Sequence, residues 1–327
     1  MNVLVTGSSG HLGEALMRML PAAGHRPLGL DLVPSTMTDA VGDVADPAFV
    51  AGLMTDIDAV IHTATLHKPH VVTHSKRAFV DTNITGTLTL LEAAVTAGVS
   101  RFIFTSTTSA FGAALSPPPG EPAAWIDETV VPVPKNIYGV TKTAAEDLCA
   151  LIHRRDGLPC LVLRTARFFP EEDDDPVMRR TYDAQNIKAN EYLYRRVDLE
   201  DAAQAHIDAL AAAPALGFDR LIISATSPFA PDDLLALRTA PDRVVAAYFP
   251  DFAQVYARCG YRMAADIARV YVNDRARQRL GWHPRYDFRR ILDQIDAGEP
   301  IGSDLARAVG VKGYHAETFT DGPFPVE

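Results

Sequence analysis

Apolar positions in the first half of the chain alternate between short continuous runs and longer stretches with a spacing of three to four residues. Short runs bounded by turn residues are typical of strands buried on both faces, and the longer spacing is typical of amphipathic helices. Alternating strands and helices predict an α/β fold with a doubly wound parallel sheet. The predicted strands are Asn2–Thr6, Arg26–Asp31, Ala59–His62, 101–106 and 160–164, and helices are predicted over 12–20, 85–97 and 140–153.

The pattern changes after residue 164. Residues 171–196 are irregular and charged, 198–212 return to helical spacing, and 220–225 are predicted as one more strand. From Ser227 onward the chain is rich in Pro, Asp and Arg and has only short periodic pieces. We expect a smaller C-terminal substrate lobe over the carboxyl edge of the sheet, where ligands bind in such folds. The sheet domain then comprises 1–169 plus 198–226, and the lobe 170–197 plus 227–327.

Composition limits the classes of partner. The 327 residues are 47% hydrophobic, enough for a sizeable core, and the formal net charge of −10 without a basic run disfavours nucleic acid and anionic membrane surfaces. No apolar run approaches the roughly 20 residues of a membrane helix, and Met1 leads into the first strand without a targeting pattern. Three cysteines without a CxxC pair favour a reducing compartment. We therefore expect a cytoplasmic protein with a small-molecule partner.

Three glycines follow the first predicted strand. Gly7, Gly10 and Gly13 have the spacing Gly-x-x-Gly-x-x-Gly between a strand and a helix. In a Rossmann-type fold such glycines allow a tight turn, approach of the backbone to a pyrophosphate, and close packing of helix on strand. The helix N-terminus at His11 and Leu12 then faces the phosphates. A helix-capping loop is the alternative, but the position directly after a buried strand favours a dinucleotide site.

Asp31 ends the second predicted strand. A carboxylate there accepts hydrogen bonds from an adenosine ribose and repels a 2′-phosphate. Residues 32–34 offer no Arg or Lys to receive that phosphate, so NAD is favoured over NADP. The alternative role of Asp31 is to cap a loop. Asp43 and Val44, after the third strand region, are expected to bracket the adenine.

A second constellation begins with Tyr138 and Lys142, which lie one helical turn apart on one face. A phenol is a poor base at neutral pH, but a neighbouring cation favours the phenolate and can also hold a cofactor ribose. The strand 101–106 leads into hydroxyl residues, of which Thr107 can orient a substrate oxygen. Without the glycine loop upstream, an exposed Tyr–Lys pair would be the simpler interpretation.

Together these pieces resemble the extended short-chain dehydrogenases/reductases, the NAD-dependent epimerase/dehydratase group. The resemblance implies that Thr107 is the catalytic hydroxyl, Tyr138 the general acid/base and Lys142 its partner. It also implies that Ala64 lines the cofactor cleft and that Asn83 supports the active-site wall. The matching motifs are 6–13, His62-Thr63-Ala64, Asn83-Ile84-Thr85-Gly86-Thr87, 106–112, Tyr138-Gly139-Val140-Thr141-Lys142, Leu163-Arg164, Leu199-Glu200-Asp201 and Leu280-Gly281-Trp282-His283-Pro284.

The chain departs from the family pattern in ways that bear on the substrate. Thr108-Ser109 replaces the Asp-Glu pair of sugar dehydratases, which disfavours dehydration and leaves Thr108 as a substrate contact. Arg167 stands where nucleotide-sugar epimerases have Asn, and Tyr194 stands where Arg is common. The stretch between Phe169 and Asp198 is shorter than the usual nucleotide-diphosphate clamp. These departures make a smaller substrate plausible.

Charged segments near the expected cleft allow more than one interpretation. His67, His70 and His74 share a loop with Lys68, and the neighbouring cations argue against a metal site. We predict that His67 faces an anionic, sugar-like substrate, whose carboxylate or phosphate this loop would hold, the alternative being a solvated loop. The acid run 171–175 is predicted to be a solvated bend without a function. At the cleft mouth Arg167, Arg195 and Arg196 either grip an anionic group or form salt bridges with that acid run.

The sequence thus predicts an NAD-dependent oxidoreductase of carbohydrate metabolism. It moves a hydride between nicotinamide and a carbinol carbon of a sugar, sugar acid or nucleotide sugar, as a dehydrogenase or a 4-epimerase. A catalytically inactive NAD-binding regulatory protein is the alternative, although Tyr138 and Lys142 are both present. The amphipathic helices at 85–97 and 140–153 resemble those through which the family forms homodimers.

Overall fold

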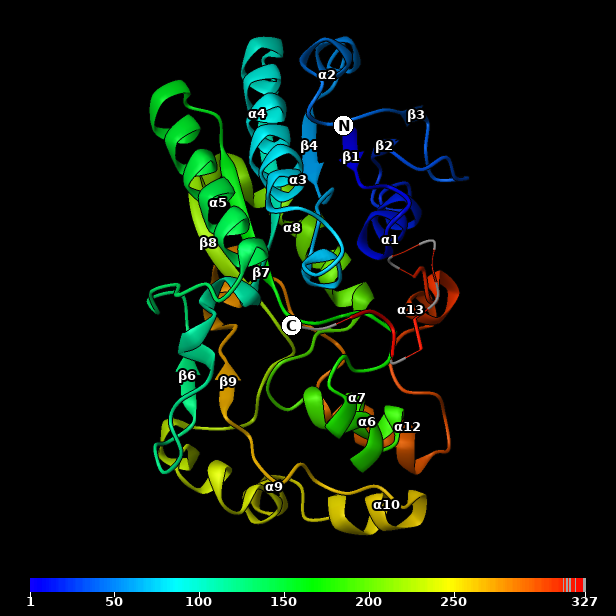
Figure 1. Ribbon diagram of the computed structural model, residues 1–327, viewed down its shortest axis with the longest axis vertical. Coiled ribbons are helices and arrows are strands. Elements are labelled where there is room, and N and C mark those ends of the chain that lie inside the picture. The colour runs from blue at the N-terminus through cyan, green and yellow to red at the C-terminus, as the bar shows by residue number, and fades with distance from the viewer. Residues whose placement is uncertain (314, 316, 318, 321, 326–327) are drawn as a thin grey trace.

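A computed structural model of the chain describes residues 1–313, 315, 317, 319–320 and 322–325. Its centre is a parallel sheet with the strand order β3-β2-β1-β4-β5-β7-β8, shown in Figure 1. This order confirms the predicted doubly wound α/β fold, because the chain winds outward in both directions from β1 and β4. The strands are β1 (Asn2–Thr6), β2 (Arg26–Asp31), β3 (Ala40–Val41), β4 (Ala59–His62), β5 (Arg101–Thr107), β7 (Cys160–Thr165) and β8 (Phe218–Ile223).

Alternate side chains of each strand enter different apolar layers. Val3 and Val5 of β1 pack into one cluster with the helices α1 (His11–Met19) and α8 (Leu199–Leu216). Leu4 belongs to the cluster on the opposite face of the sheet. That second layer is formed with α2 (Pro47–Leu53), α4 (Gly86–Ala97) and α5 (Ile137–Asp156). The sheet is therefore buried on both faces, which explains its continuous apolar strands.

The predicted elements exist, and the differences are at their ends. The helix predicted over 140–153 extends from Ile137 to Asp156, because Asn136 caps its start and Gly157 ends it in the left-handed conformation. A π-helix, Val80–Thr85, precedes α4 where a simple helix start was predicted. The last strand of the main sheet lies at Phe218–Ile223, whereas it was predicted at 220–225.

The remaining chain forms a second layer of structure beyond the carboxyl edge of the sheet. Strand β6 (Ala124–Ile126) pairs with β9 (Arg269–Tyr271) rather than with the main sheet. A third apolar cluster here includes Leu237, Phe252 and Ile291. The helices of this layer are α6 (Pro176–Thr181), α7 (Ala184–Glu191), α9 (Pro241–Tyr248), α10 (Phe252–Cys259) and α12 (Phe288–Asp296). Helices α11 (Asp274–Leu280) and α13 (Asp304–Val309) return to pack against α8, and a short helix α3 (Lys76–Phe79) packs against α5.

The chain leaves the sheet after β7 and returns to it through a narrow neck. The backbone N–H of Arg167 donates to the carbonyl of Arg195 at 3.2 Å, and the N–H of Val197 donates to the carbonyl of Arg167 at 3.0 Å. Residues 168–195 are thus an excursion whose two ends are hydrogen-bonded to each other before α8 begins.

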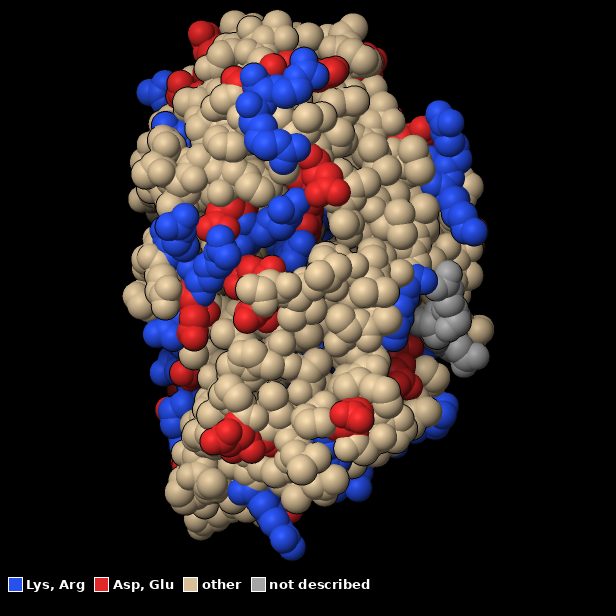
Figure 2. Space-filling view, turned by 90° about the vertical axis from the view of Figure 1, so that its left-hand side faces the viewer, with Lys and Arg blue, Asp and Glu red and all other residues tan. Residues whose placement is uncertain are grey.

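Surface charges on the face that carries α5 and β8 are interspersed. Arg220 pairs with Asp147 on α5, and Arg275 and Arg279 both pair with Asp219 of β8. Figure 2 shows Lys and Arg side chains beside Asp and Glu over the upper part of this face. Within the described residues, no helix is both long enough and apolar enough to cross a membrane.

Candidate active site

A cavity of about 600 Å³ lies at the carboxyl edge of the sheet. Its walls come from the loops that follow β1, β2, β4, β5 and β7, and from the start of α5. The structure brings almost all of the predicted site residues to this one cavity: Gly7, Gly10, His11, Leu12, Gly13, Asp31, Asp43, Val44, Ala64, His67, Thr107, Thr108, Tyr138 and Arg167.

The glycines of the loop after β1 are required for different structural reasons. Gly7 has a φ of +69°, and a Cβ there would lie 2.8 Å from the Ala64 nitrogen. A Cβ on Gly13 would lie 1.9 Å from the Gly7 carbonyl oxygen, so this position is fixed by close packing. A Cβ on Gly10 would approach only that same oxygen, at 3.3 Å. Packing alone therefore does not require glycine at position 10, whereas a pyrophosphate close to the backbone does, and the loop fits a dinucleotide.

Asp31 holds the adjoining loop. Its carboxylate accepts hydrogen bonds from the Ser9 N–H at 2.9 Å and from the Val33 N–H at 3.0 Å. The loop-capping role considered from the sequence is thus present, and the side chain also lines the cavity, where a ribose contact is predicted. Leu32, next to it, is 63% exposed. No cation follows Asp31 in this loop, in agreement with the preference predicted for NAD.

The catalytic side chains come from β5 and α5. Thr107 is the last residue of β5, and Tyr138 and Lys142 lie in the first turns of α5. The Tyr138 hydroxyl lies close enough to Thr107 for that side chain to lower its pKa, and the Thr107 Oγ1 accepts from the Ser109 N–H at 3.0 Å. The Lys142 Nζ lies 4.0 Å from the centroid of the Phe104 ring. Thr107 and Tyr138 therefore line the cavity together, whereas Lys142 is buried one helical turn further along α5.

Burial, rather than the neighbouring cation, dominates the titration of these groups. Burial raises the pKa of Tyr138 to about 12, against the opposing effect of the hydrogen bond with Thr107. Burial also lowers the pKa of Lys142 to about 7, although Glu146 acts in the other direction. We expected Lys142 to lower the pKa of the Tyr138 phenol, but the protein side chains do not produce that effect, because burial raises this pKa. A buried ammonium loses its hydration and with it much of its charge near neutral pH.

Asn83 ties the wall to the catalytic helix. Its amide nitrogen donates to the Thr141 Oγ1 at 3.0 Å and to the Leu66 carbonyl at 2.8 Å. Its amide oxygen accepts from the Leu66 N–H at 2.8 Å. One buried side chain from the π-helix therefore joins α5 to the loop after β4, and a role of Asn83 towards the cofactor stays a prediction.

A buried carboxylate behind the triad was missed by sequence reasoning. Glu146 lies one helical turn after Lys142 and accepts from the Ser106 hydroxyl at 2.6 Å and from Arg164 at 2.7 Å. Both side chains of the Glu146–Arg164 pair are buried. The spacing of four residues from Lys142 on the same helix was the signal that could have identified it.

The histidines differ in surroundings and role. His62 is buried in the sheet and bridges the hydroxyls of Thr6, at 2.7 Å, and Thr87, at 3.0 Å. His67 lines the cavity, with its ring centroid 6.5 Å from that of Tyr138, and burial holds its pKa well below the usual value. His67 thus faces the cavity as a neutral hydrogen-bonding ring rather than a cation. Among the described residues no group of three or more His, Cys, Asp or Glu side chains is arranged to hold a metal ion.

The acid run 171–175 is not the solvated bend predicted from the sequence. Glu171 and Asp173 are buried. The Glu171 carboxylate lies 2.8 Å from the His11 Nε2 at the start of α1, and Asp174 pairs with Lys68. The prediction was wrong because sequence proximity made these acids look mutually repulsive, whereas the fold places Asp173 and Asp174 against arginine and lysine side chains and Glu171 against the His11 ring.

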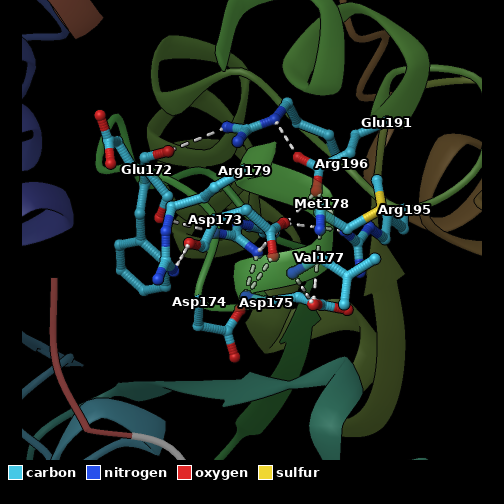
Figure 3. Close-up of polar contacts among 12 residues, drawn as sticks. Glu172, Asp173, Asp174, Asp175, Val177, Met178, Arg179, Glu191, Arg195 and Arg196 are labelled. Carbon is cyan, nitrogen blue, oxygen red and sulfur yellow. Dashed lines mark hydrogen bonds and ion pairs between the residues drawn. The ribbon is translucent and has the colours of Figure 1, made fainter. Parts of the chain in front are cut away.

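Asp173 meets the arginines of the cleft. Its Oδ2 accepts from Arg167 at 3.0 Å and from Arg195 at 3.1 Å. Figure 3 shows Asp173 and Arg195 within this group of charged side chains. Glu191, which sequence reasoning missed, is buried beside Arg195 and Arg196. Burial opposes ionisation of Glu191, but the surrounding guanidinium groups hold its pKa well below the usual value. The structure therefore shows the salt-bridge alternative for these arginines, while Arg167 and Arg195 also line the cavity.

Comparison with known proteins agrees with this geometry. The model of the NAD dependent epimerase/dehydratase family matches residues 3–215. A UDP-glucose 4-epimerase of Rhizobium meliloti is 27% identical over 335 residues, which cover 89% of this chain and 95% of that protein. An NAD-dependent glucose-6-phosphate dehydrogenase of Haloferax volcanii is 32% identical over 166 residues, 46% of this chain and 62% of that protein.

Solved structures share the fold. The UDP-glucuronic acid 4-epimerase of Bacillus cereus, solved with UDP-glucuronic acid and NAD, has a TM-score of 0.63 at 19% identity, covering 94% of this chain and 100% of that one. The UDP-N-acetylglucosamine 4-epimerase of the same organism also has a TM-score of 0.63, at 20% identity, covering 91% and 98% of the two chains. With its glycine loop and its Thr–Tyr–Lys triad, this chain belongs to the NAD-dependent epimerase/dehydratase family of extended short-chain dehydrogenases/reductases and is an NAD-dependent enzyme.

Proposed function

We propose that this enzyme is a dehydrogenase that oxidises a carbinol carbon of a sugar or sugar acid. The observation that carries the proposal is that Thr107 and Tyr138 line the same cavity as the glycine loop. An acid/base group beside a dinucleotide site is what hydride transfer at a carbinol requires. The inactive regulatory protein considered from the sequence lacks support, because the relatives are enzymes and the triad is assembled.

The cavity residues divide the task of holding the cofactor. The backbone at Gly10, His11 and Leu12 is placed for the pyrophosphate, and Asp31 for the adenosine ribose. Asp43, Val44 and Ala64 line the same end of the cavity, and Asn83 keeps its wall in place. When NAD is bound, its nicotinamide supplies the hydride acceptor.

The triad handles the substrate proton. Thr107 orients the substrate hydroxyl by a hydrogen bond, and Tyr138 takes the proton from it as a phenolate. A phenol whose pKa is about 12 needs positive charge nearby to ionise at neutral pH, and the Lys142 ammonium is the protein group placed to provide it. Thr108 and His67 border the space left for the rest of the substrate.

A nucleotide-sugar 4-epimerase is the second candidate. The Rhizobium meliloti protein that matches along nearly its whole length is a UDP-glucose 4-epimerase. An epimerase uses the same triad but keeps its cofactor and returns the hydride to the other face of the keto intermediate. The short segment 168–195, with its arginines already engaged by acidic side chains, favours the dehydrogenase.

Product analysis of the purified protein decides between the two. We expect NADH to accumulate in proportion to a sugar or sugar acid consumed. Inversion of a nucleotide sugar at one carbon without net NADH would identify the epimerase instead. Tight NAD binding with no turnover across sugars, sugar acids and nucleotide sugars would revive the regulatory protein.

Two further properties belong to the same proposal. Three free cysteines, Cys149, Cys160 and Cys259, are compatible with a cytoplasmic location.

Val140 and Leu151 are exposed apolar side chains on α5, in keeping with a homodimer that pairs through α4 and α5. We also retain 1–169 plus 198–226 as the NAD-binding domain and the remainder as the substrate lobe. Size-exclusion chromatography with light scattering tests the dimer.

A further inference from the structure

The substrate end of the cavity contains two guanidinium groups that meet on one carboxylate oxygen. Arg167 and Arg195 come from either side of the excursion's neck, and their side chains are each 20% exposed in the cavity wall. The Asp173 Oδ2 accepts from the Arg167 Nη1 and the Arg195 Nη2, while its Oδ1 accepts from the Asp175 N–H at 2.8 Å. Convergence of two guanidinium groups on one oxygen is how proteins bind a carboxylate or phosphate.

Asp173 is held in this position by contacts on both sides. Glu171 is anchored at His11 of the glycine loop, and Asp174 at Lys68 on the loop after β4. The backbone carbonyl of Asp173 also accepts from Arg179 at 2.6 Å (Figure 3). A carboxylate tethered in this way faces the guanidinium groups at a high effective concentration, so a dissolved anion competes poorly with it.

Displacement of Asp173 is unfavourable for a second reason. Its side chain is only 3% exposed, so moving it off the arginines leaves a buried carboxylate without its counter-ions. Both guanidinium groups nonetheless reach the cavity, because each arginine side chain is 20% exposed in its wall.

We propose that Asp173 is a specificity-determining residue, an internal anion that keeps phosphate- and carboxylate-bearing groups away from Arg167 and Arg195. The group that reaches this end of the cavity is then neutral, which narrows the substrate to a neutral sugar. This narrowing rests on the proposed dehydrogenase function, whereas the exclusion of anions can be measured without any turnover.

The test is a calorimetric titration of the NAD-loaded protein with UDP, a soluble diphosphate. Loading with NAD keeps UDP away from the glycine loop. We expect wild-type protein to bind UDP with a Kd weaker than about 1 mM, and Asp173→Asn to bind at least tenfold more tightly. The gain should shrink as salt is raised, because the new contacts are ionic and reach the solvent through the cavity.

Glu172→Gln is the matched control. It removes the same charge from the neighbouring position, but Glu172 is exposed and meets Arg167 only through its backbone carbonyl. We expect its affinity for UDP to equal that of the wild type. An equal gain in Glu172→Gln would show that only the net charge matters, and the proposal would then be wrong.

Three further results bear on the proposal that Asp173 excludes anions. Micromolar UDP binding by the wild type, or a folded Asp173→Asn protein without any gain, overturns the proposal. If Asp173→Asn fails to fold by circular dichroism, the wild-type titration still tests exclusion, and Asp174→Asn, which removes the other acidic partner of Arg167 in the run, should show a smaller gain. Absence of turnover on any sugar contradicts the proposed function but leaves these binding results intact.

Discussion

The cofactor end and the substrate end of the cavity are lined by different kinds of chemical group. At the cofactor end the walls include backbone, glycines and short hydroxyl side chains, as at Gly7, Gly13 and Thr63. At the substrate end they include long charged side chains that neutralise one another, as at Arg167 and Asp174. A wall made of backbone fits one ligand shape, whereas a single substitution in a wall of ion pairs changes the charge that a ligand meets. Changes at the first end should therefore be severe, and changes at the second should alter selectivity.

The largest effect is expected where the two ends meet. Tyr138→Phe removes one oxygen and little volume, so turnover should fall at least about 100-fold while NAD affinity and thermal stability stay near those of the wild type. Steady-state kinetics and a fluorescence titration with NAD measure both properties. Substantial residual activity would mean that Thr107 or a water molecule carries the proton.

Two glycine variants separate the packing role of the glycine loop from its role in binding the pyrophosphate. Gly13→Ala places a Cβ 1.9 Å from the Gly7 oxygen, so it should both destabilise the protein and abolish NAD binding. Gly10→Ala meets that oxygen only at 3.3 Å, so it should fold normally and lose about tenfold in NAD affinity. Thermal unfolding with and without NAD separates the two effects. Normal NAD affinity in Gly10→Ala would place the pyrophosphate elsewhere.

Cofactor selectivity provides a more moderate test. Asp31→Ala combined with Leu32→Arg replaces a repelling carboxylate with a guanidinium at an exposed position, and should shift the preference toward NADP by about tenfold or more. Leu32→Arg alone is the control, because it keeps the carboxylate that Ser9 and Val33 contact. An unchanged ratio of NADP to NAD affinity in the double variant would remove Asp31 from the ribose site.

The smallest effect concerns pH and the buried ammonium. The pKa of Lys142 is about 7 in the folded protein, whereas an unfolded lysine stays protonated to above pH 10. Between pH 7 and 9 the unfolded chain therefore binds a proton that the folded chain lacks. The free energy of unfolding should rise with pH by up to about 1.4 kcal/mol per unit, relative to Lys142→Met.

Denaturant unfolding of the cofactor-free protein at several pH values measures this slope. Below pH 7 both states carry the proton and the difference in slope should vanish. Parallel profiles for wild type and Lys142→Met would show that the folded protein keeps Lys142 charged.

The same contrast explains what could be predicted from the sequence. Gly7 to Gly13, and Tyr138 with Lys142, are contiguous patterns that depend on spacing along one element, and the structure brings the three glycines and Tyr138 to one cavity. Salt bridges between the acid run and Arg167 or Arg195 were one of two alternatives, and spacing could not choose between them because Arg195 lies 22 residues from Asp173. Burial also reversed the expected direction of the Tyr138 pKa, because desolvation is a property of the folded surroundings.

The neck at Arg167 and Val197 makes the excursion 168–195 a separable cassette. Two backbone hydrogen bonds close it, and the strands on either side of it, β7 and β8, pair with each other regardless of its contents. The entropy of closing a loop grows only slowly with its length, so residues can be added or removed beyond the neck at little cost to the sheet. Longer or shorter inserts grafted at this point should change which molecules the enzyme accepts, and inserts that keep Glu171 against His11 should leave the NAD loop as it is.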